Sequence, residues 1–150
     1  MDRTDSTIAE LMGLVVDLPF AYFRLKAAGD RMAGRVGQTT GKWGLMRTLH
    51  DQGPHTVAQV ARSRPVARQW VQRLANELEA EGLVEFVDNP AHKRAKLLRL
   101  TPKGESVLHQ MVKRETQWAR RIATDFDLRG LRTTRATLRK LRDVLARQRD

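Results

Sequence analysis

The stretch from Thr56 to Thr101 constrains the fold most, because helix signals and turn signals follow one another in it at short spacing. Thr56 and Gln59 have the spacing of a capping box, which satisfies two backbone amides at the start of a helix. This helix is expected to end before Arg64-Pro65, since proline disfavours helical backbone in the residue before it. Val66 is then expected to be a buried residue of a tight turn.

A second, longer helix is predicted from about Ala67 to Glu81. Val71, Leu74 and Leu78 recur at helical spacing and form its apolar side. Gly82 is placed to end the helix in the left-handed conformation. Two helices joined by so short a turn can cross at a large angle, which presents the second helix to a partner.

The charges along this second helix are divided by sign. The segment 62–73 holds four arginines and no acid, while glutamates follow from Glu77 onward. A positive helix N-terminus favours an anion, and arginine and glutamine can bind guanine and adenine edges bidentately. An ordinary surface helix in a basic protein is the alternative for this element taken by itself. The residues predicted to contact DNA bases lie on the side away from the apolar positions: Arg68, Gln69, Gln72 and Arg73. Those predicted to contact the DNA backbone precede them: Arg62 and Arg64.

Two strand-like runs, Leu83–Val87 and Ala95–Leu100, follow the second helix and predict a β-hairpin. The turn-forming residues between them end in Lys93 and Arg94, so the tip of the hairpin is basic. A hairpin with a basic tip beside a helix-turn-helix is typical of a winged helix.

Several residues of this stretch match a family pattern: Leu78, Gly82, Leu83, Val84, Arg94 and the run from Leu100 to Gly104. With them, residues 37–108 resemble the MarR family of winged-helix transcription regulators. The resemblance implies that Arg94 reaches into the minor groove of DNA, and Lys93 is expected to contact phosphate. The sequence departs from the family at His92, where an aspartate often stands two residues before the arginine.

Long apolar helices are predicted at both ends of the chain. The first runs from Thr7 to about Arg35, and Pro19 is expected to kink or divide it. Thr101-Pro102 should open another helix that extends to Phe126, and leucines form a seam after Asp127. Little of the chain is left to cover these helices, which favours a two-fold homodimer over a monomeric bundle whose ends pack on each other. The MarR resemblance implies the same dimer.

The predicted fold class is therefore mainly α with a small β-hairpin wing. A supporting helix from about Thr40 is expected to end at Asp51-Gln52-Gly53-Pro54. Residues 37–101 are assigned to the DNA-binding winged helix-turn-helix, and residues 1–36 and 102–150 to a helical dimerisation region. Together they are predicted to form a single interwoven domain.

The MarR resemblance also implies that a small molecule can lower DNA affinity by binding between the dimerisation helices and the winged helix. Arginine or histidine among aromatic side chains suits an aromatic or anionic effector. Packing in the core is the alternative role for each candidate. The residues assigned to this crevice are Phe20, Phe23, Arg24, Trp43, Met46, His50 and Trp118.

Composition narrows the functional classes. A formal charge of +11 and a pI near 11.1 favour a polyanionic partner such as double-stranded DNA. The sequence lacks cysteine, which excludes disulfides and thiolate metal sites, and its four histidines have no metal-ligand spacing. No catalytic or nucleotide-binding motif is present, so neither an enzyme nor a cofactor is predicted.

The location and the competing function follow from the same features. No apolar run reaches the length of a membrane span and the N-terminus lacks the pattern of a signal peptide, so a cytoplasmic protein is expected. The competing function is a basic protein that binds nucleic acid without sequence preference and without a regulatory ligand. Preference for a palindromic duplex over random sequence separates the two.

Overall fold

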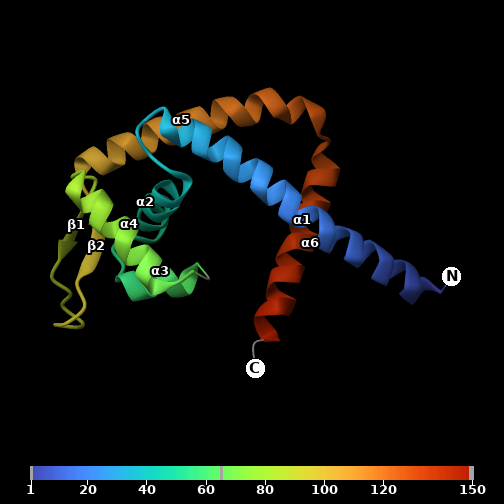
Figure 1. The fold of residues 1–150 in the computed structure, drawn as a ribbon, viewed down its shortest axis with the longest axis horizontal. Helices are drawn as coiled ribbons and strands as arrows, with labels where there is room; N and C mark the ends of the chain where they lie inside the picture. The colour runs from blue at the N-terminus through green and yellow to red at the C-terminus, as the bar shows by residue number, and fades with distance from the viewer. Residues whose placement is uncertain (1, 65, 149–150) are drawn as a thin grey trace. The chain divides into compact units, whose positions relative to one another are not determined.

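The computed structural model describes residues 2–64 and 66–148, which are mainly helical (Figure 1). In chain order the elements are α1 Arg3–Gly34, α2 Thr40–Gln52, α3 Val57–Ser63, α4 Arg68–Ala80, β1 Val84–Val87, β2 Leu97–Leu100, α5 Pro102–Ile122, the short 3-10 helix η1 Ala123–Asp125 and α6 Leu128–Arg147. They form two compact units, Met1–Val112 and Lys113–Asp150. The predicted fold class, mainly α with a small β-hairpin wing, is confirmed.

The core of the first unit lies among α2, α3, α4 and the hairpin. Met46, Leu78 and Leu98 come from three of these elements, and none of them is exposed to solvent. The predicted capping box is present, because the Thr56 hydroxyl accepts from the Gln59 amide at 3.2 Å and the Gln59 side chain accepts from the Thr56 amide at 2.8 Å. Its hydrogen bonds fix where α3 begins.

The second helix of the motif begins and ends close to the predicted residues. Val71 and Leu78 on its apolar side are buried, and Gly82 follows it with a φ of 71°. This positive φ lets the chain reverse directly into β1. The expectation that Val66 is a buried turn residue is wrong, because its side chain is 37% exposed; Pro65, which should stop the first helix, lies outside the described residues.

The wing is a two-stranded antiparallel hairpin in which Val84 pairs with Leu100 and Phe86 with Leu98. Val84 and Leu98 are fully buried, so the apolar side of the hairpin faces the core. The sequence did not predict that His55 forms an isolated antiparallel bridge with Leu98. Two backbone hydrogen bonds, of 3.1 and 2.9 Å, join these residues and tie the α2–α3 loop to the wing.

The terminal helices differ from the prediction in two places. α1 begins at Arg3 rather than Thr7, and Pro19 lies inside it without dividing it; a proline removes only one helical hydrogen bond. α5 ends at Ile122, so Phe126 does not belong to it and is 56% exposed. The reason is that Asp127 accepts from the amide of Gly130 at 2.7 Å and caps a new helix. Within the described residues, no helix is both long and apolar enough to cross a membrane.

Asp30 joins the end of α1 to the start of α2. Its carboxylate accepts from the Thr40 amide at 3.1 Å and from the Thr40 hydroxyl, and it pairs with the Lys26 amine at 2.5 Å. Hydrogen bonds from Lys26 and then from Thr40 lower the pKa of Asp30 from 3.8 to about 2. The charged form is therefore favoured in the folded state.

This lowered pKa predicts a loss of stability in acid. A carboxylate whose pKa falls on folding stabilises the protein above its unfolded pKa, and this contribution is lost as the pH falls through the folded pKa. We expect Asp30→Asn to melt below the wild type at neutral pH and the two melting temperatures to converge between about pH 4 and pH 2. Circular dichroism melts across this range measure the difference; a gap that stays constant down to pH 2 would contradict the role of the charge.

Candidate nucleic-acid interface

The outward side of α4 carries the side chains predicted to contact bases. Arg68, Gln69 and Arg73 are exposed, whereas Gln72 is partly buried and donates to Asn76 at 2.8 Å. The N-cap residue of α4 is Ala67, whose side chain has no oxygen to accept from the first amides of the helix. These amides and the arginines of the first turns give α4 a positive N-terminal end.

Residues from α4 and the wing meet in one hollow of the surface. Arg68 and Gln72 line it from the helix, and Arg94 and Lys96 line it from the hairpin. Its other lining residues are neutral: Thr56, Val57, Phe86 and Ala95. Three cations thus border a hollow whose lining contains no carboxylate, which is an environment that favours an anion.

The hollow also shows a residue that the sequence analysis missed. Lys96 follows the turn of the wing and is exposed. In the sequence, Lys96 lies within the run that predicts the second strand, and nothing in this run marks it as an interface residue. When the hairpin pairs from Leu97 onward, Lys96 comes to line the same hollow as Arg68.

The other predicted backbone contacts lie in different surroundings. Arg62, Lys93 and Arg94 are exposed. The side chain of Arg64 is partly buried and donates from Nη1 to the Thr48 hydroxyl at 3.3 Å, so it lies against α2.

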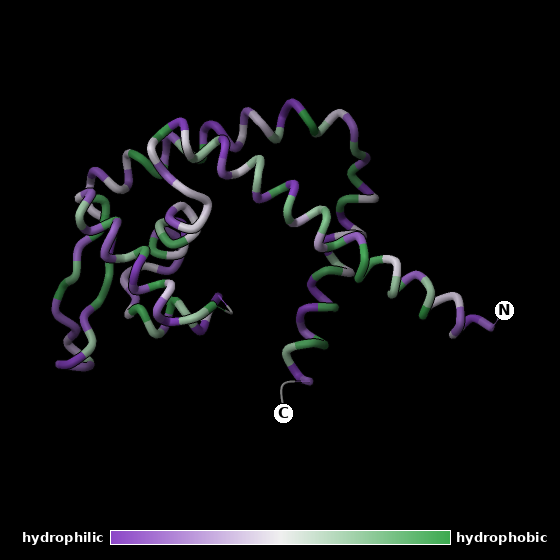
Figure 2. The backbone as a smooth tube through the Cα atoms, in the orientation of Figure 1, coloured by the Kyte–Doolittle hydropathy of each residue, from purple (hydrophilic) through white to green (hydrophobic). Residues whose placement is uncertain are grey.

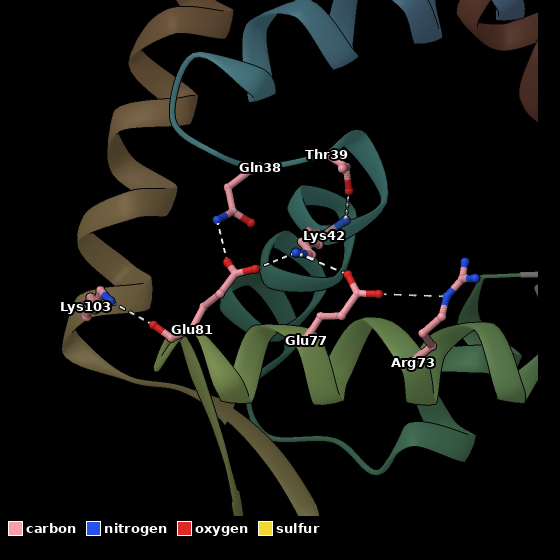
Figure 3. A network of polar contacts seen from close by, with 7 residues as sticks. All are labelled: Gln38, Thr39, Lys42, Arg73, Glu77, Glu81 and Lys103. Atoms are coloured by element: carbon pink, nitrogen blue, oxygen red, sulfur yellow. Dashed lines mark hydrogen bonds and ion pairs between the residues drawn. The ribbon is translucent and has the colours of Figure 1, made fainter.

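A polar network holds the C-terminal half of α4 in place (Figure 3). The amine of Lys42, on α2, pairs with Glu81 at 2.5 Å and with Glu77 at 3.2 Å. Gln38 donates to Glu81 at 2.8 Å, and Lys103 donates to the Glu81 carbonyl at 2.7 Å. The acidic end of α4 is thus bound to α2, to the loop before it and to the start of α5.

The network shifts two pKa values. The hydrogen bond with Glu81 raises the pKa of Lys42 above its usual range. Burial pushes the pKa of Glu81 upward, but hydrogen bonds from Lys42 and Gln38 outweigh it and the net shift of this pKa is downward. Both side chains therefore stay charged at neutral pH, and the pairing persists there.

The residues assigned to an effector crevice are found in both units. Phe20 and Phe23 on α1 are 71% and 65% exposed, while Met46 on α2 is fully buried. His50 is bonded through Nδ1 to Glu105 at 3.0 Å. The remaining members are Arg24, which is exposed, and Trp43 and Trp118, which are partly buried; Trp118 belongs to the second unit. In the part of the chain that the structure describes, no group of three acidic or histidine side chains could hold a metal ion.

Comparisons with known proteins agree on one family. Residues 37–95 match the model of the MarR family. An uncharacterized protein of Mycobacterium tuberculosis is 37% identical over 132 residues, which cover 88% of this chain and 92% of that protein.

Two solved structures share the fold at low sequence identity. A mutant of MarR from E. coli, complexed with operator DNA, has a TM-score of 0.79 and 17% identity, and covers 88% of this chain and 95% of its own. BpsR of Bordetella bronchiseptica, whose DNA binding is regulated by 6-hydroxynicotinic acid, has a TM-score of 0.75 and 24% identity over 84% of this chain and 90% of its own. The family match, the relative and the shared winged-helix fold lead to one conclusion: the chain belongs to the MarR family of transcription regulators.

Proposed function

We propose that the protein binds double-stranded DNA as a homodimer at a palindromic operator and regulates transcription there. The observation that carries this proposal is the hollow between α4 and the wing, where Arg68, Arg94 and Lys96 stand with no carboxylate in the lining. Duplex DNA has closely spaced phosphates along both strands, and cations grouped in this way release its counterions. The operator DNA bound by the E. coli neighbour of the same fold adds support.

In this proposal α4 is the recognition helix and enters the major groove. Its exposed Arg68, Gln69 and Arg73, together with Gln72, are the side chains offered to base edges. The network around Lys42 supports this role, because it engages Glu77 and Glu81 and so keeps the acidic half of the helix bound to the protein. Glu77 and Glu79 remain exposed on this half, whereas the first turns of the helix expose the cations Arg68 and Arg73.

The wing and the end of α3 supply contacts to the DNA backbone. Lys93 and Lys96 are proposed phosphate contacts, and Arg94 is proposed to reach the minor groove. Arg62 is exposed at the end of α3 and is a further candidate for a phosphate contact. Such contacts fix the register of the protein on the duplex without reading its sequence.

The homodimer is proposed because each terminal helix leaves apolar side chains uncovered within the chain. On α1, Ile8, Val15 and Phe20 are between 47% and 71% exposed, and on α6 none of the described residues is buried. Hydrophobic and hydrophilic residues alternate along α6 (Figure 2). In a two-fold dimer these faces would be buried, and the two copies of α4 would enter successive major grooves about 34 to 36 Å apart.

A small anionic aromatic molecule is proposed to weaken DNA binding. Arg24 and His50 are the basic residues among those assigned to its site from the sequence, and they suit an anionic ligand. BpsR, the neighbour regulated by 6-hydroxynicotinic acid, supports this class of ligand. Titrating this compound into the protein–DNA complex tests the proposal, and an unchanged affinity at millimolar ligand would argue against this compound as the effector.

Selection of bound duplexes from a random pool tests the proposed function. The expected result is an enriched sequence with two symmetric half-sites, bound about 10³-fold or more tightly than random duplex at near-physiological salt. A pool that stays random after selection would favour the competing function, a nucleic-acid-binding protein without sequence preference.

Variants of α4 and of the wing are expected to lose affinity in different ways. Loss of a bidentate base contact costs about 1 to 3 kcal/mol and relaxes preference at one position, while loss of a phosphate contact lowers the salt slope by about one unit. We therefore expect Arg68→Ala and Gln72→Ala to reduce discrimination between operator and random duplex. Lys93→Ala should weaken both duplexes equally, and Arg94→Ala should lose most affinity where the flanks are A·T-rich.

Binding isotherms on operator, random and G·C-flanked duplexes across a salt series measure these differences. Lys140→Ala is the matched control, because this exposed cation lies on α6 and outside the proposed interface. Equal weakening of every duplex by the two α4 variants would show that Arg68 and Gln72 do not read bases.

A further inference from the structure

The side chain of Arg64 is held against α2, unlike that of its neighbour Arg62. Arg64 caps α3 in an extended conformation, with φ −123° and ψ 107°, and its amide donates to the Val60 carbonyl at 3.1 Å. Its guanidinium donates to Thr48 on α2. The backbone of this residue thus belongs to the turn between α3 and α4, whereas its side chain belongs to the surface of α2.

Gly44 provides the space in which the guanidinium lies. A β-carbon at this position would stand 2.4 Å from Nη1, 2.6 Å from Nη2 and 2.8 Å from Cζ of Arg64. All three distances are shorter than any normal contact, so the guanidinium can occupy this place only because residue 44 has no side chain. The two residues form a matched pair.

The hydroxyl of Thr48 also contacts Arg64, and it acts only as the acceptor in that contact. Thr48 is 8% exposed and donates its proton to the Gly44 carbonyl at 3.0 Å. The oxygen then has only lone pairs left, and these accept from Arg64 at 3.3 Å. That hydrogen bond is long, so packing over Gly44 contributes to holding the guanidinium together with Thr48.

A second glycine of α2 receives α4 in the same manner. A β-carbon on Gly41 would stand 2.9 Å from Cζ2 of Trp70 and 3.3 Å from Cδ1 of Leu74. Gly41 and Gly44 are three residues apart and lie on one side of α2. This side of α2 therefore contacts the recognition helix through Trp70 and the turn before that helix through Arg64.

We propose that Arg64 is a positioning residue: seated on Gly44, it fixes the α3–α4 turn to α2 and so sets the orientation in which α4 meets the bases. This inference rests on the proposed function and replaces the phosphate contact that the sequence predicted for Arg64. It assigns an internal role to one arginine of a segment whose other arginines face solvent.

The test compares Arg64→Ala, Gly44→Ala and the double variant on operator and random duplexes across a salt series. Gly44→Ala keeps the charge of Arg64 but displaces its guanidinium. We expect each single variant to bind operator about tenfold more weakly than wild type and the double variant to be no weaker than the weaker single, because one interaction is lost only once. The salt slope should stay at the wild-type value, and binding to random duplex should change little.

Two further variants separate charge from shape. Arg64→Lys keeps the charge but lacks the planar fork, so it should bind operator as weakly as Arg64→Ala. Arg62→Ala removes a neighbouring exposed cation and should lower the salt slope by about one unit. Melting curves ensure that every variant is folded at the assay temperature.

Hydrogen exchange provides a readout that does not depend on DNA. Release of the turn should speed exchange at the amides of Arg64 and Trp70, which donate to the carbonyls of Val60 and Ala67, in both Arg64→Ala and Gly44→Ala. Arg62→Ala should leave these rates unchanged.

Several results would overturn the inference. A shallower salt slope for Arg64→Ala, with Gly44→Ala at wild-type affinity, would make Arg64 a phosphate contact. Equal losses of affinity for operator and random duplex would leave Arg64 only a structural role. Unchanged hydrogen exchange at the turn would show that Arg64 does not fix the turn to α2. Failure of the proposed function is a separate result, because it would show in the wild type as absence of operator preference.

Discussion

Replacing Gly104 with alanine is expected to lower the free energy of unfolding by about 3 kcal/mol or more, at or beyond the upper end for overpacked cores. Gly104 lies buried in the first turn of α5, and a β-carbon there would stand 2.0 Å from the Leu83 carbonyl oxygen and 3.1 Å from Cδ2 of Leu100. The obstructing atom belongs to the backbone and accepts from the Thr101 amide at 3.1 Å, so it cannot rotate away. To make room, α5 must separate from the start of the wing.

Chemical denaturation of Gly104→Ala measures this loss. Gly34→Ala is the matched control, because no atom lies within 4 Å of its added β-carbon and its backbone is helical. The control should stay within about 1 kcal/mol of wild type, which is the difference in helix propensity between glycine and alanine. Wild-type stability of Gly104→Ala would mean that α5 and the wing do not pack as closely as the structure has them.

Removal of the residues after Asp127 is expected to abolish the proposed dimer and to weaken operator binding by about 10²- to 10⁴-fold. The factor is the gain that a linked second half-site gives over binding of one half-site. The deletion removes the apolar side of α6, including Leu131 and Leu145, which are 42% and 53% exposed within the chain. Sedimentation at micromolar concentration should show monomers or aggregates, and operator isotherms should show the lost affinity.

Point substitutions on α6 make the same test without shortening the chain. Leu131→Glu with Leu138→Glu places two acids on the leucine seam and should break the dimer. Thr133→Glu with Ala136→Glu adds the same charge on the other side of the helix and should leave the dimer intact. If both pairs of substitutions leave a dimer with full operator affinity, α6 is not part of the dimer contact.

Much of the winged helix-turn-helix was predictable because its signals are local. The capping box of Thr56 and Gln59, the left-handed Gly82 and the Thr101 cap of α5 each act within a few residues of the chain. Apolar residues at helical spacing identified the buried side of α4 in the same way. The end of α5 is an exception. Apolar spacing predicted a helix up to Phe126, but the helix cap at Asp127 begins a separate helix, α6.

The candidate interface was predictable only in part. The cations of α4 and of the wing tip can be found by their spacing, but Lys96 lines the same hollow as Arg68 only when the hairpin pairs. Arg64 looked like its exposed neighbours in sequence, because nothing within the turn indicates that its side chain crosses to α2. Its distance to Thr48, sixteen residues earlier in the chain, depends on how α2 and α3 pack.

The sequence by itself determined the elements, their order and the sign of the charge on α4, because helix caps, periodicity and turns are set by neighbouring residues. Only the tertiary structure decided which of those charged side chains remain exposed to a partner and which are paired within the protein. Lys42 meets Glu81 across 39 residues, and Gly104 meets the Leu83 carbonyl at the junction of α5 with the wing. Such contacts depend on the packing of whole elements. A glycine leaves space in which an arginine side chain or a backbone carbonyl can lie, and residue spacing along the chain does not predict these contacts.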